Sequence, residues 1–281
     1  MVSPRYRILF PVDFSDRSVS AAPYVKIWVD RFGAVLDTLH VIDNRELRPE
    51  DDELRSLIER RTADLKYFSD HHFGEHAASS TVLSGSIADE IEYFAKHEKV
   101  DLIMLPRDHQ HLTTRFLHDS LAATLLERCA ALVWITEYLD EVPPVRSILC
   151  AMHFEQDASL DAQGARMLQT VQELASRFQA RVAFLHVLHG HDQASNESVT
   201  DLGTVAEVEP WAVKAQELFG GSVGLLRRSG DVIAAIGDTA KQLAADLIVV
   251  GRTSPGTIGL GSQSHILKID HAAHRPVLSV W

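Results

Sequence analysis

The chain repeats its own sequence pattern, and this internal repeat constrains the fold more than any other feature. Four blocks occur twice in the same order: RYRILFPVDFS (5–15) with VRSILCAMHFE (145–155), FGAVLDTLHVID (32–43) with FQARVAFLHVLH (178–189), GSIADEIEYFAKHEKVDLIML (85–105) with GDVIAAIGDTAKQLAADLIVV (230–250), and ALVWI (131–135) with PVLSV (276–280). Two similar halves predict two similar domains, which we place at residues 1–140 and 141–281. The acidic stretch EYLDEVPPV (137–145) joins them, and its two prolines stiffen it and exclude helix.

Each half alternates short apolar runs with helical patterns. The runs ILFPV, AVLDTLHVI, DLIML and ALVWI in the first half are typical of strands, as are their partners in the second half. Apolar residues recur at helical spacing between them: Leu54, Leu57, Ile58, Leu65 and Phe68 in the first half, and Leu168, Val171, Leu174, Ala175 and Phe178 in the second. Gly33 stands where a C-cap glycine would end the first helix. Strands that are apolar on both faces and alternate with helices predict an α/β fold with two tandem doubly wound parallel domains.

The composition limits the classes of function. The 281 residues carry a formal net charge of −12, which argues against general nucleic-acid binding because phosphate contacts need clustered Lys and Arg. No apolar run approaches the roughly 20 residues of a membrane span, and the N-terminus lacks the pattern of a signal peptide. We therefore expect a cytoplasmic protein that binds neither nucleic acid nor membrane. Cys129 and Cys150 have no CxxC spacing and are predicted to be buried free thiols.

The 15 histidines raise the question of a metal site. His72 and His76 are four residues apart and could share a helix face, but neither HExxH nor a Cys/His zinc spacing is present. We therefore expect surface and loop histidines, with His40 and His186 at the ends of strands. GxxxxGK[ST] does not occur, and we identify no constellation that indicates a catalytic nucleophile and base.

A ligand of such a fold binds where the strands end at their carboxyl edge. The loop GRTSPGTIGLGSQSH (251–265) follows the run DLIVV and is rich in glycine and serine, as loops that receive phosphate on backbone N–H groups are. The corresponding loop of the first half, PRDHQHLTTRFLHDS (106–120), has the same length and no glycine. The simpler interpretation of the second-half loop is an irregular surface loop without a ligand, since Gly and Ser are common in loops.

The repeated pattern ILFPVDFS, LHVID, GSIADEI, VDLIML resembles the universal stress protein family, and the two halves together resemble a tandem member of it. The resemblance covers nearly the whole chain. It implies a five-stranded parallel sheet in each half, and it implies that ALVWI and PVLSV pair edge to edge and join the halves as an intramolecular pseudo-dimer. Family members either bind ATP or do not, and the binders carry an Asp after the first strand and a loop of the form G-x2-G-x9-G-[S/T].

The resemblance assigns the first half a degenerate nucleotide site. Asp13 matches the family Asp, Val41 ends the second strand beside the base pocket, and Ser120 matches the last residue of the loop motif. A simpler role for Asp13 is that of a helix N-cap or a turn residue.

The three glycines of the family motif are replaced in the first half by Pro106, His109 and Asp119. Pro106 has no amide N–H to donate, and Asp119 would place a carboxylate beside a triphosphate. We therefore expect that the first half does not bind ATP.

The second half keeps a different part of the motif. His153 replaces the family Asp, and Val187 ends the second strand. The candidate phosphate-binding residues are Gly251, Ser254, Gly256, Gly259, Gly261, Ser262 and Ser264, and the motif serine is either Ser262 or Ser264. We expect any ATP or AMP, with Mg, to bind in this half, although His153 is also explained as a polar residue at a strand end.

The resemblance implies a non-enzymatic stress-response regulator or ligand sensor that requires no cofactor. One alternative is a protein-interaction module in which both nucleotide sites are lost, and a weaker one is a slow ATPase or self-phosphorylating protein. We also expect that two copies of the pseudo-dimer can associate into a homodimer.

Overall fold

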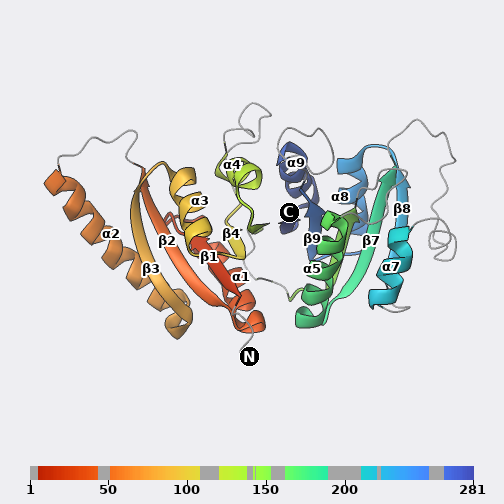
Figure 1. Cartoon of the computed structure of the whole chain (residues 1–281), viewed down its shortest axis with the longest axis horizontal. Coiled ribbons are helices and arrows are strands. Elements are labelled where there is room, and N and C mark those ends of the chain that lie inside the picture. The colour runs from red at the N-terminus through yellow and green to blue at the C-terminus, as the bar shows by residue number, and fades with distance from the viewer. Residues whose placement is uncertain are drawn as a thin grey trace. The chain divides into compact units, whose positions relative to one another are not determined.

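The computed structural model describes residues 6–43, 51–107, 120–137, 142, 144–152, 162–188, 210–219, 223–252 and 263–281. The chain forms two compact units, Met1–Val142 and Pro143–Trp281. Figure 1 shows that each unit is built from strands and helices that alternate along the chain. The predicted α/β class is therefore confirmed in both halves, and each unit is considered by itself below.

The first unit contains a parallel sheet with helices on it. Its described strands are β1 (Arg7–Pro11), β2 (Val35–Asp43), β3 (Ala77–Gly85), β4 (Leu102–Leu105) and β5 (Leu132–Ile135). Its described helices are α1 (Asp16–Phe32), α2 (Asp51–His72), the short 3-10 helix η1 (Gly74–His76), α3 (Ile87–His97) and α4 (Leu121–Arg128). Neighbouring strands pair in parallel in the order β3-β2-β1-β4-β5. This order changes direction at β1 and β4, which places the ligand edge of a doubly wound sheet at the carboxyl ends of these strands.

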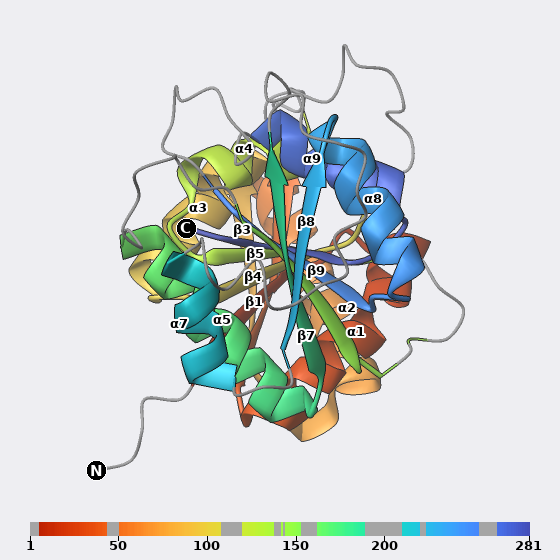
Figure 2. The same cartoon turned by 90° about the vertical axis from the view of Figure 1, so that its right-hand side faces the viewer.

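The second unit repeats this topology. Its described strands are β6 (Ser147–Met152), β7 (Arg181–Leu188), β8 (Gly224–Ser229), β9 (Leu247–Gly251) and β10 (Val277–Val280), and its described helices are α5 (Ala162–Phe178), α7 (Pro210–Phe219), α8 (Val232–Gln242) and α9 (Gln263–Ala273). The strands pair in parallel in the order β8-β7-β6-β9-β10. Figure 2 shows β7 and β8 with α5 and α7 on one side and α8 on the other. The prediction of a parallel sheet flanked by helices is thus confirmed twice.

Central strands and the helix faces against them form the cores. Ile8, Leu9 and Phe10 of β1 are fully buried, as is the corresponding stretch of β6. In the first unit Trp28 of α1 meets Trp134 of β5 edge to face, with ring centroids 4.8 Å apart. Such an aromatic pair stabilises the core beyond the area that it buries.

Both cysteines are free and buried, as predicted. Burial raises the pKa of the Cys150 thiol far above its ordinary value, so this residue is an unreactive part of the core.

Equivalent helix ends have the same backbone conformation in the two units. Gly33 follows α1 with φ 59°, and its N–H donates to the carbonyl of Val29, which confirms the predicted C-cap. Gln179 follows α5 with φ 55°. Lys99 after α3 and Ala244 after α8 are also left-handed, with φ of 54° and 46°. The repeat therefore keeps the cap geometry even where no glycine is present.

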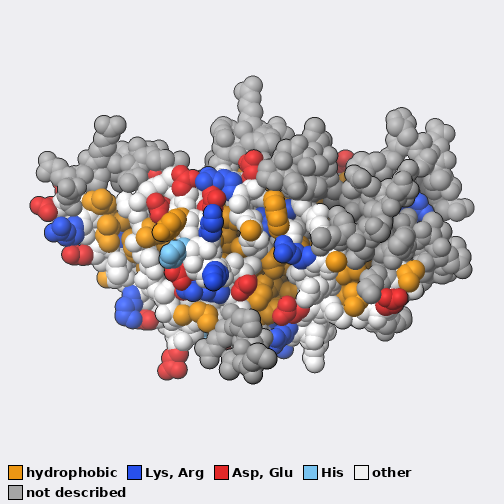
Figure 3. All heavy atoms as spheres, in the orientation of Figure 1, with side chains coloured by type: hydrophobic (Ala, Val, Ile, Leu, Met, Phe, Trp, Pro, Cys, Tyr) orange, Lys and Arg blue, Asp and Glu red, His pale blue; other side chains and the backbone are white. Residues whose placement is uncertain are grey.

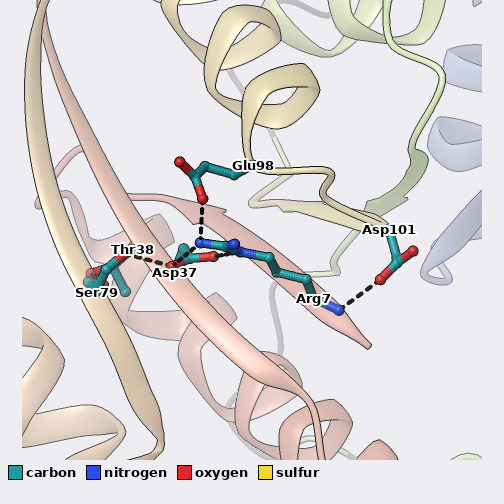
Figure 4. A network of polar contacts seen from close by, with 6 residues as sticks. All are labelled: Arg7, Asp37, Thr38, Ser79, Glu98 and Asp101. Carbon is teal, nitrogen blue, oxygen red and sulfur yellow. Dashed lines mark hydrogen bonds and ion pairs between the residues drawn. The ribbon is translucent and has the colours of Figure 1, made fainter. Parts of the chain in front are cut away.

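A partly buried ion pair lies near the amino ends of the first unit's strands (Figure 4). The Arg7 guanidinium donates to Asp37 (2.5 Å) and contacts Glu98 (2.8 Å), and the Ser79 hydroxyl donates to Asp37 (2.5 Å). The Asp37 side chain is fully buried, whereas that of Arg7 is 30% exposed. The backbone N–H of Arg7 donates to Asp101. The prediction that the strands are apolar on both faces is therefore wrong for β2, whose buried carboxylate is compensated by an arginine.

One helical prediction also fails. Helix α2 ends at His72, and His76 belongs to η1, so these two histidines do not share the face of one helix. Within the described ranges, no cluster of three or more His, Cys, Asp or Glu is arranged to hold a metal ion. Among the described helices, none combines the length and the apolarity that crossing a membrane requires.

Candidate functional site

The carboxyl end of β1 leads into a turn that Asp13 organises. Its carboxylate accepts hydrogen bonds from the Ser15 N–H (3.0 Å), the Ser15 hydroxyl (2.5 Å) and the Ser18 hydroxyl (2.6 Å). Arg17 lies 3.3 Å away on the same carboxylate. The N-cap of α1 is Ser15 rather than Asp13, so of the two simpler roles the turn residue is right and the helix cap is wrong.

These contacts govern the ionisation of Asp13. Burial, the largest single influence, favours the neutral acid, but the hydrogen bonds from Ser15 and Ser18 and the charge of Arg17 together outweigh it. The pKa of Asp13 therefore lies below its ordinary value. About half of the side chain is exposed (48%), but its acceptor oxygens already bind residues of its own turn.

Phe14, the residue after Asp13, is left-handed with φ 61°, an unusual conformation for a bulky residue. Its ring lies 4.6 Å from the His40 ring, measured between centroids, and the Arg61 guanidinium of α2 lies 5.5 Å from its centre. Phe68 of α2 meets the same ring edge to face. Strained backbone of this kind persists only where surrounding contacts hold it, and here an imidazole, an arginine and an aromatic ring do so.

His40 lies within β2, three residues before its end, so its predicted place at the strand end holds only approximately. Its Nδ1 is 2.7 Å from the carbonyl oxygen of Val12, to which the Nδ1–H donates. Burial is the largest influence on its ionisation, and with Arg61 nearby it holds the pKa of His40 below its ordinary value. The Val12 carbonyl and Asp13 oppose this shift. His40 thus joins β1 to β2 at the edge where a ligand would bind.

The other predicted residues of the first half lie on separate elements. Val41 is half-buried in β2 and pairs with Leu83 of β3. Ser120 is the N-cap of α4, and its hydroxyl accepts a hydrogen bond from the Ala123 N–H at 3.1 Å. The capping role accounts for Ser120 without a nucleotide.

A buried ion pair lies at the start of the loop that follows β4 in the first unit. Pro106 follows β4, and the next residue, Arg107, is only 3% exposed and forms a buried ion pair with Glu137, which is 6% exposed. His109 and Asp119 lie outside the described residues. A guanidinium and a carboxylate therefore lie at the carboxyl edge of the sheet, where the loop after β4 begins.

The second unit has a different arrangement at the same edge. Gly251 ends β9, and a Cβ placed on it would lie 2.8 Å from the Met167 sulfur and 3.3 Å from the Gln163 amide nitrogen, both on α5. The Gln163 side chain donates to the carbonyl of Arg252. Both atoms are the far ends of flexible side chains that can move aside, so packing alone does not require glycine at position 251. Val187 is buried in β7, 1% exposed, opposite Arg228 of β8.

The remaining candidates of the second half are not described. His153, Ser254, Gly256, Gly259, Gly261 and Ser262 lie outside the described residues. Ser264 lies in the first turn of α9, with its side chain outside the described part. The nucleotide-binding roles of all these residues, and of Asp13, Val41, Ser120, Val187 and Gly251, stay predictions.

Sequence reasoning missed several residues at these edges. Phe14, Arg61 and Gln163 are brought there by the fold, and no motif marks them. The one usable signal was position: Gln163 belongs to the first turn of the helix that follows β6, and such a turn borders the carboxyl edge of a doubly wound sheet.

Comparison with known proteins agrees with this fold. A universal stress protein from Archaeoglobus fulgidus DSM 4304 superposes with a TM-score of 0.72 at 18% identity, covering 98% of this chain and 95% of its own. A putative universal stress protein from Pseudomonas aeruginosa UCBPP-PA14 gives 0.64 at 15% identity, covering 99% and 93%. The cytoplasmic domain of a prokaryotic cation chloride cotransporter gives 0.56 at 11%, covering 98% and 95%.

These structural similarities, at such identities, show the fold. None of the curated proteins matches the chain. The model of the universal stress protein family matches twice, over residues 5–137 and 146–280, which together make up nearly the whole sequence. The chain therefore belongs to the universal stress protein family and carries one family domain in each half.

Proposed function

We propose that the protein is a non-enzymatic stress-response regulator or ligand sensor that acts in the cytoplasm. The observation that carries this proposal is the double match to the universal stress protein family over residues 5–137 and 146–280. Within the described residues, the groups at the carboxyl edges serve as turn, cap and ion-pair residues rather than as a nucleophile beside a base.

In this proposal the second unit holds the nucleotide site, for ATP or AMP with Mg. The phosphates contact the segment that begins at Gly251, with Gly261, Ser262 and Ser264 at its far end. Glycine-rich backbone and the start of α9 supply N–H groups and a positive helix end to a phosphate. The packing of Gly251 against α5 supports this segment but does not by itself require a ligand.

The first unit binds no nucleotide in this proposal. Three observations support its loss of function: the Asp13 carboxylate is engaged by its own turn, Phe14 lies against His40, and the loop begins with the buried pair of Arg107 and Glu137. A triphosphate would have to displace these contacts at a cost in free energy.

Isothermal titration of nucleotide-stripped protein with Mg-ATP, repeated with AMP, tests this assignment. One site per chain that Gly261→Asp abolishes and Asp13→Ala leaves unchanged is the expected result. Two sites, or a single site lost with Asp13→Ala, would place binding in the first unit. No heat and no thermal shift at saturating nucleotide would contradict nucleotide sensing and favour a protein-interaction module.

The absence of enzymatic activity has its own test. Phosphate release and self-phosphorylation are measured with Mg-ATP, and both are expected to equal the blank. Release above the blank that is lost in Gly261→Asp would instead establish slow ATP hydrolysis in the second unit.

The pairing of β5 with β10 is part of the same proposal and joins the halves as a pseudo-dimer. Edge strands that are buried in this way avoid aggregation. Hydrogen exchange provides the test, since amides of both strands should be protected to the same degree as those of β4 and β9. Fast exchange along β5 and β10 would contradict the pairing.

A further inference from the structure

Helix α2 of the first unit is buried along only part of its length. From position 52 to position 64 none of its residues is buried, whereas Leu65, Phe68 and Ser69 are. Figure 1 shows the first turns of α2 farther from β3 than its last turns. We call residues 52–64 the outer part of α2 and residues 65–72 the inner part. A segment with few buried side chains opens at a lower free energy than the rest of its unit.

The inner part is held by apolar packing and by hydroxyl contacts. The Ser69 hydroxyl lies 2.8 Å from that of Thr38 in β2 and 3.1 Å from that of Ser80 in β3. Phe68 packs against Phe10 of β1, with ring centroids 6.4 Å apart. None of the groups in these contacts changes its charge near neutral pH. These contacts therefore keep the inner part in place when the pH changes.

The outer part reaches the turn after β1 through Arg61. Its guanidinium lies over the ring of Phe14, 5.5 Å from the centroid, and 3.1 Å from the Asp64 carboxylate. A cation over an aromatic ring is attracted by the quadrupole of the ring. Phe14 is left-handed with φ 61°, a conformation that persists in a bulky residue only where contacts compensate for its cost. The contact of Arg61 with Phe14 thus joins the outer part of α2 to the carboxyl edge of the sheet.

His40 contacts the same ring from β2. The two ring centroids are 4.6 Å apart, and the Nδ1–H of His40 donates to the Val12 carbonyl at 2.7 Å. With Nδ1 as the donor, Nε2 is the nitrogen that takes up a proton when the pH falls. An imidazolium would be a second cation beside the ring that Arg61 contacts, and two like charges repel. A charged His40 therefore competes with Arg61 for Phe14.

Other charges around His40 act in both directions. Burial is the largest influence and disfavours the imidazolium, as does the charge of Arg61. The backbone carbonyl that His40 binds and the carboxylates of Asp13 and Asp64 favour it. Strand β3, on the other side of β2, carries no charged residue. Coupling between two sites is reciprocal, so a positive charge on His40 weakens the hold of Arg61 as much as Arg61 weakens proton binding.

We propose that Phe14 is an acid-sensitive latch for α2, which holds Arg61 and the outer part of the helix while His40 is neutral and releases them when His40 gains a proton. The released Arg61 turns toward Asp64 and solvent, since its side chain is already 42% exposed. The outer part loosens and the inner part stays in place. The first unit thereby senses pH, a role that goes beyond the nucleotide site proposed for the second unit and does not depend on it.

Hydrogen exchange at pH 8 and pH 5, without nucleotide, tests the release. After correction for the intrinsic rate at each pH, amides of the outer part should lose protection at pH 5 about tenfold more than those of the inner part. His40→Asn keeps a donor for the Val12 carbonyl but cannot gain a proton, so its outer part should stay equally protected. His71 and His72 also titrate, but they lie in the inner part, whose exchange reports their effect separately.

Titration of the histidines by NMR tests the coupling to Arg61, and the His40 signal is identified by its absence from His40→Asn. Arg61→Met keeps an unbranched side chain against Phe14 but removes the charge. It should make His40 bind its proton about threefold more tightly. The matched control is Arg60→Met, which removes the same charge at the exposed neighbouring position and should leave proton binding unchanged.

The latch is supported if the outer part loses protection at pH 5 in the wild type but not in His40→Asn, and if Arg61→Met strengthens proton binding while Arg60→Met does not. Equal protection of the wild-type outer part at both pH values overturns it. So does a loss that persists in His40→Asn, or an equal effect of Arg61→Met and Arg60→Met on His40. Circular dichroism checks that each variant is folded, and His40→Gln replaces His40→Asn if the latter is not. A failure of nucleotide binding leaves these outcomes unchanged.

Discussion

The two units have the same strand order, but at one set of equivalent positions the first unit has polar and charged residues where the second has small ones. In the first unit Asp37 faces Ser79 across β2 and β3, and Arg7 completes the ion pair. The equivalent residues of β7 and β8 are Ala183 and Gly224, which also face each other.

The first residue of β6, which is equivalent to Arg7, is Ser147. A Cβ on Gly224 would lie 3.2 Å from the Ala183 Cβ, so the second unit is closely packed where the first is polar.

The two units thus differ at all three of these positions together. A buried carboxylate is tolerated beside an arginine and a hydroxyl, whereas one partner left alone is costly. By contrast, the backbone contact at the start of the first strand is kept, since Asp101 accepts from the Arg7 N–H and Asp246 from the Arg146 and Ser147 N–H groups. The same strand order therefore accommodates either a polar set in which each buried group has a partner or a set of small residues without polar side-chain contacts.

The largest predicted loss of stability comes from removing the carboxylate from the polar set of Arg7, Asp37 and Ser79. Asp37→Ala should lower the free energy of unfolding by about 2–3 kcal/mol, because Arg7 loses its buried partner while Glu98 and solvent compensate in part. Urea unfolding measures it. Asp70→Ala, which removes an exposed pair with Lys66, is the control and should cost less than about 0.5 kcal/mol.

Replacing the whole set should cost less than breaking it. The triple variant Arg7→Ser, Asp37→Ala, Ser79→Gly installs the residues of the second unit and should lose only about 1 kcal/mol, because no buried group is left unpaired. A triple variant less stable than Asp37→Ala would show that the three residues are not exchanged as a unit.

The reverse experiment introduces the polar residues of the first unit at the equivalent positions of the second unit. Ala183→Asp introduces a partly desolvated carboxylate with no arginine at position 147 and should destabilise by about 1–2 kcal/mol. Adding Ser147→Arg should recover part of this loss, as judged by the unfolding midpoint in urea. Simple additivity of the two substitutions would argue against an ion pair in that geometry.

His40, at the carboxyl edge of the first sheet, is expected to make the stability of the protein depend on pH. Since the pKa of His40 is lower in the folded protein, its contribution to stability is complete above its unfolded pKa of about 6.5 and is lost as the pH falls toward the folded pKa. His40→Asn retains a donor for the Val12 carbonyl and should flatten the stability profile between about pH 8 and pH 5. The wild type, unfolded in urea at the same pH values, is the reference for the slope.

The smallest predicted effect concerns the helix caps. Gln179→Gly should stabilise the protein by about 0.5–1 kcal/mol, because glycine adopts the φ of 55° at this position without steric cost. Gly33→Gln at the equivalent position should destabilise by a similar amount, although nothing lies within 4 Å of a Cβ placed there. Thermal unfolding of both variants compares them, and equal stability of all forms would mean that the left-handed conformation is not the cause.

Local sequence patterns predicted helices and their ends in this protein. The period of three and four residues from Leu54 to Phe68 predicted α2, and Gly33 marked the end of α1. Both signals work because helix periodicity and a left-handed cap depend on neighbours a few residues away. The spacing of His72 and His76 misled for the same reason, since a helix end between them removed the shared face.

The sequence by itself determined two parallel α/β domains through its repeat and its apolar runs. It determined the family through the resemblance of its motifs, and the free buried cysteines through the lack of CxxC spacing. Only the tertiary structure decided which polar groups meet. It placed Arg7 on Asp37, which is 30 residues away, and brought α5 against Gly251. It also turned Phe14 onto His40 and left β3 as an uncharged edge. The physical reason is that strand register and helix packing join residues distant in sequence, and hydrophobic periodicity carries no information about those pairs.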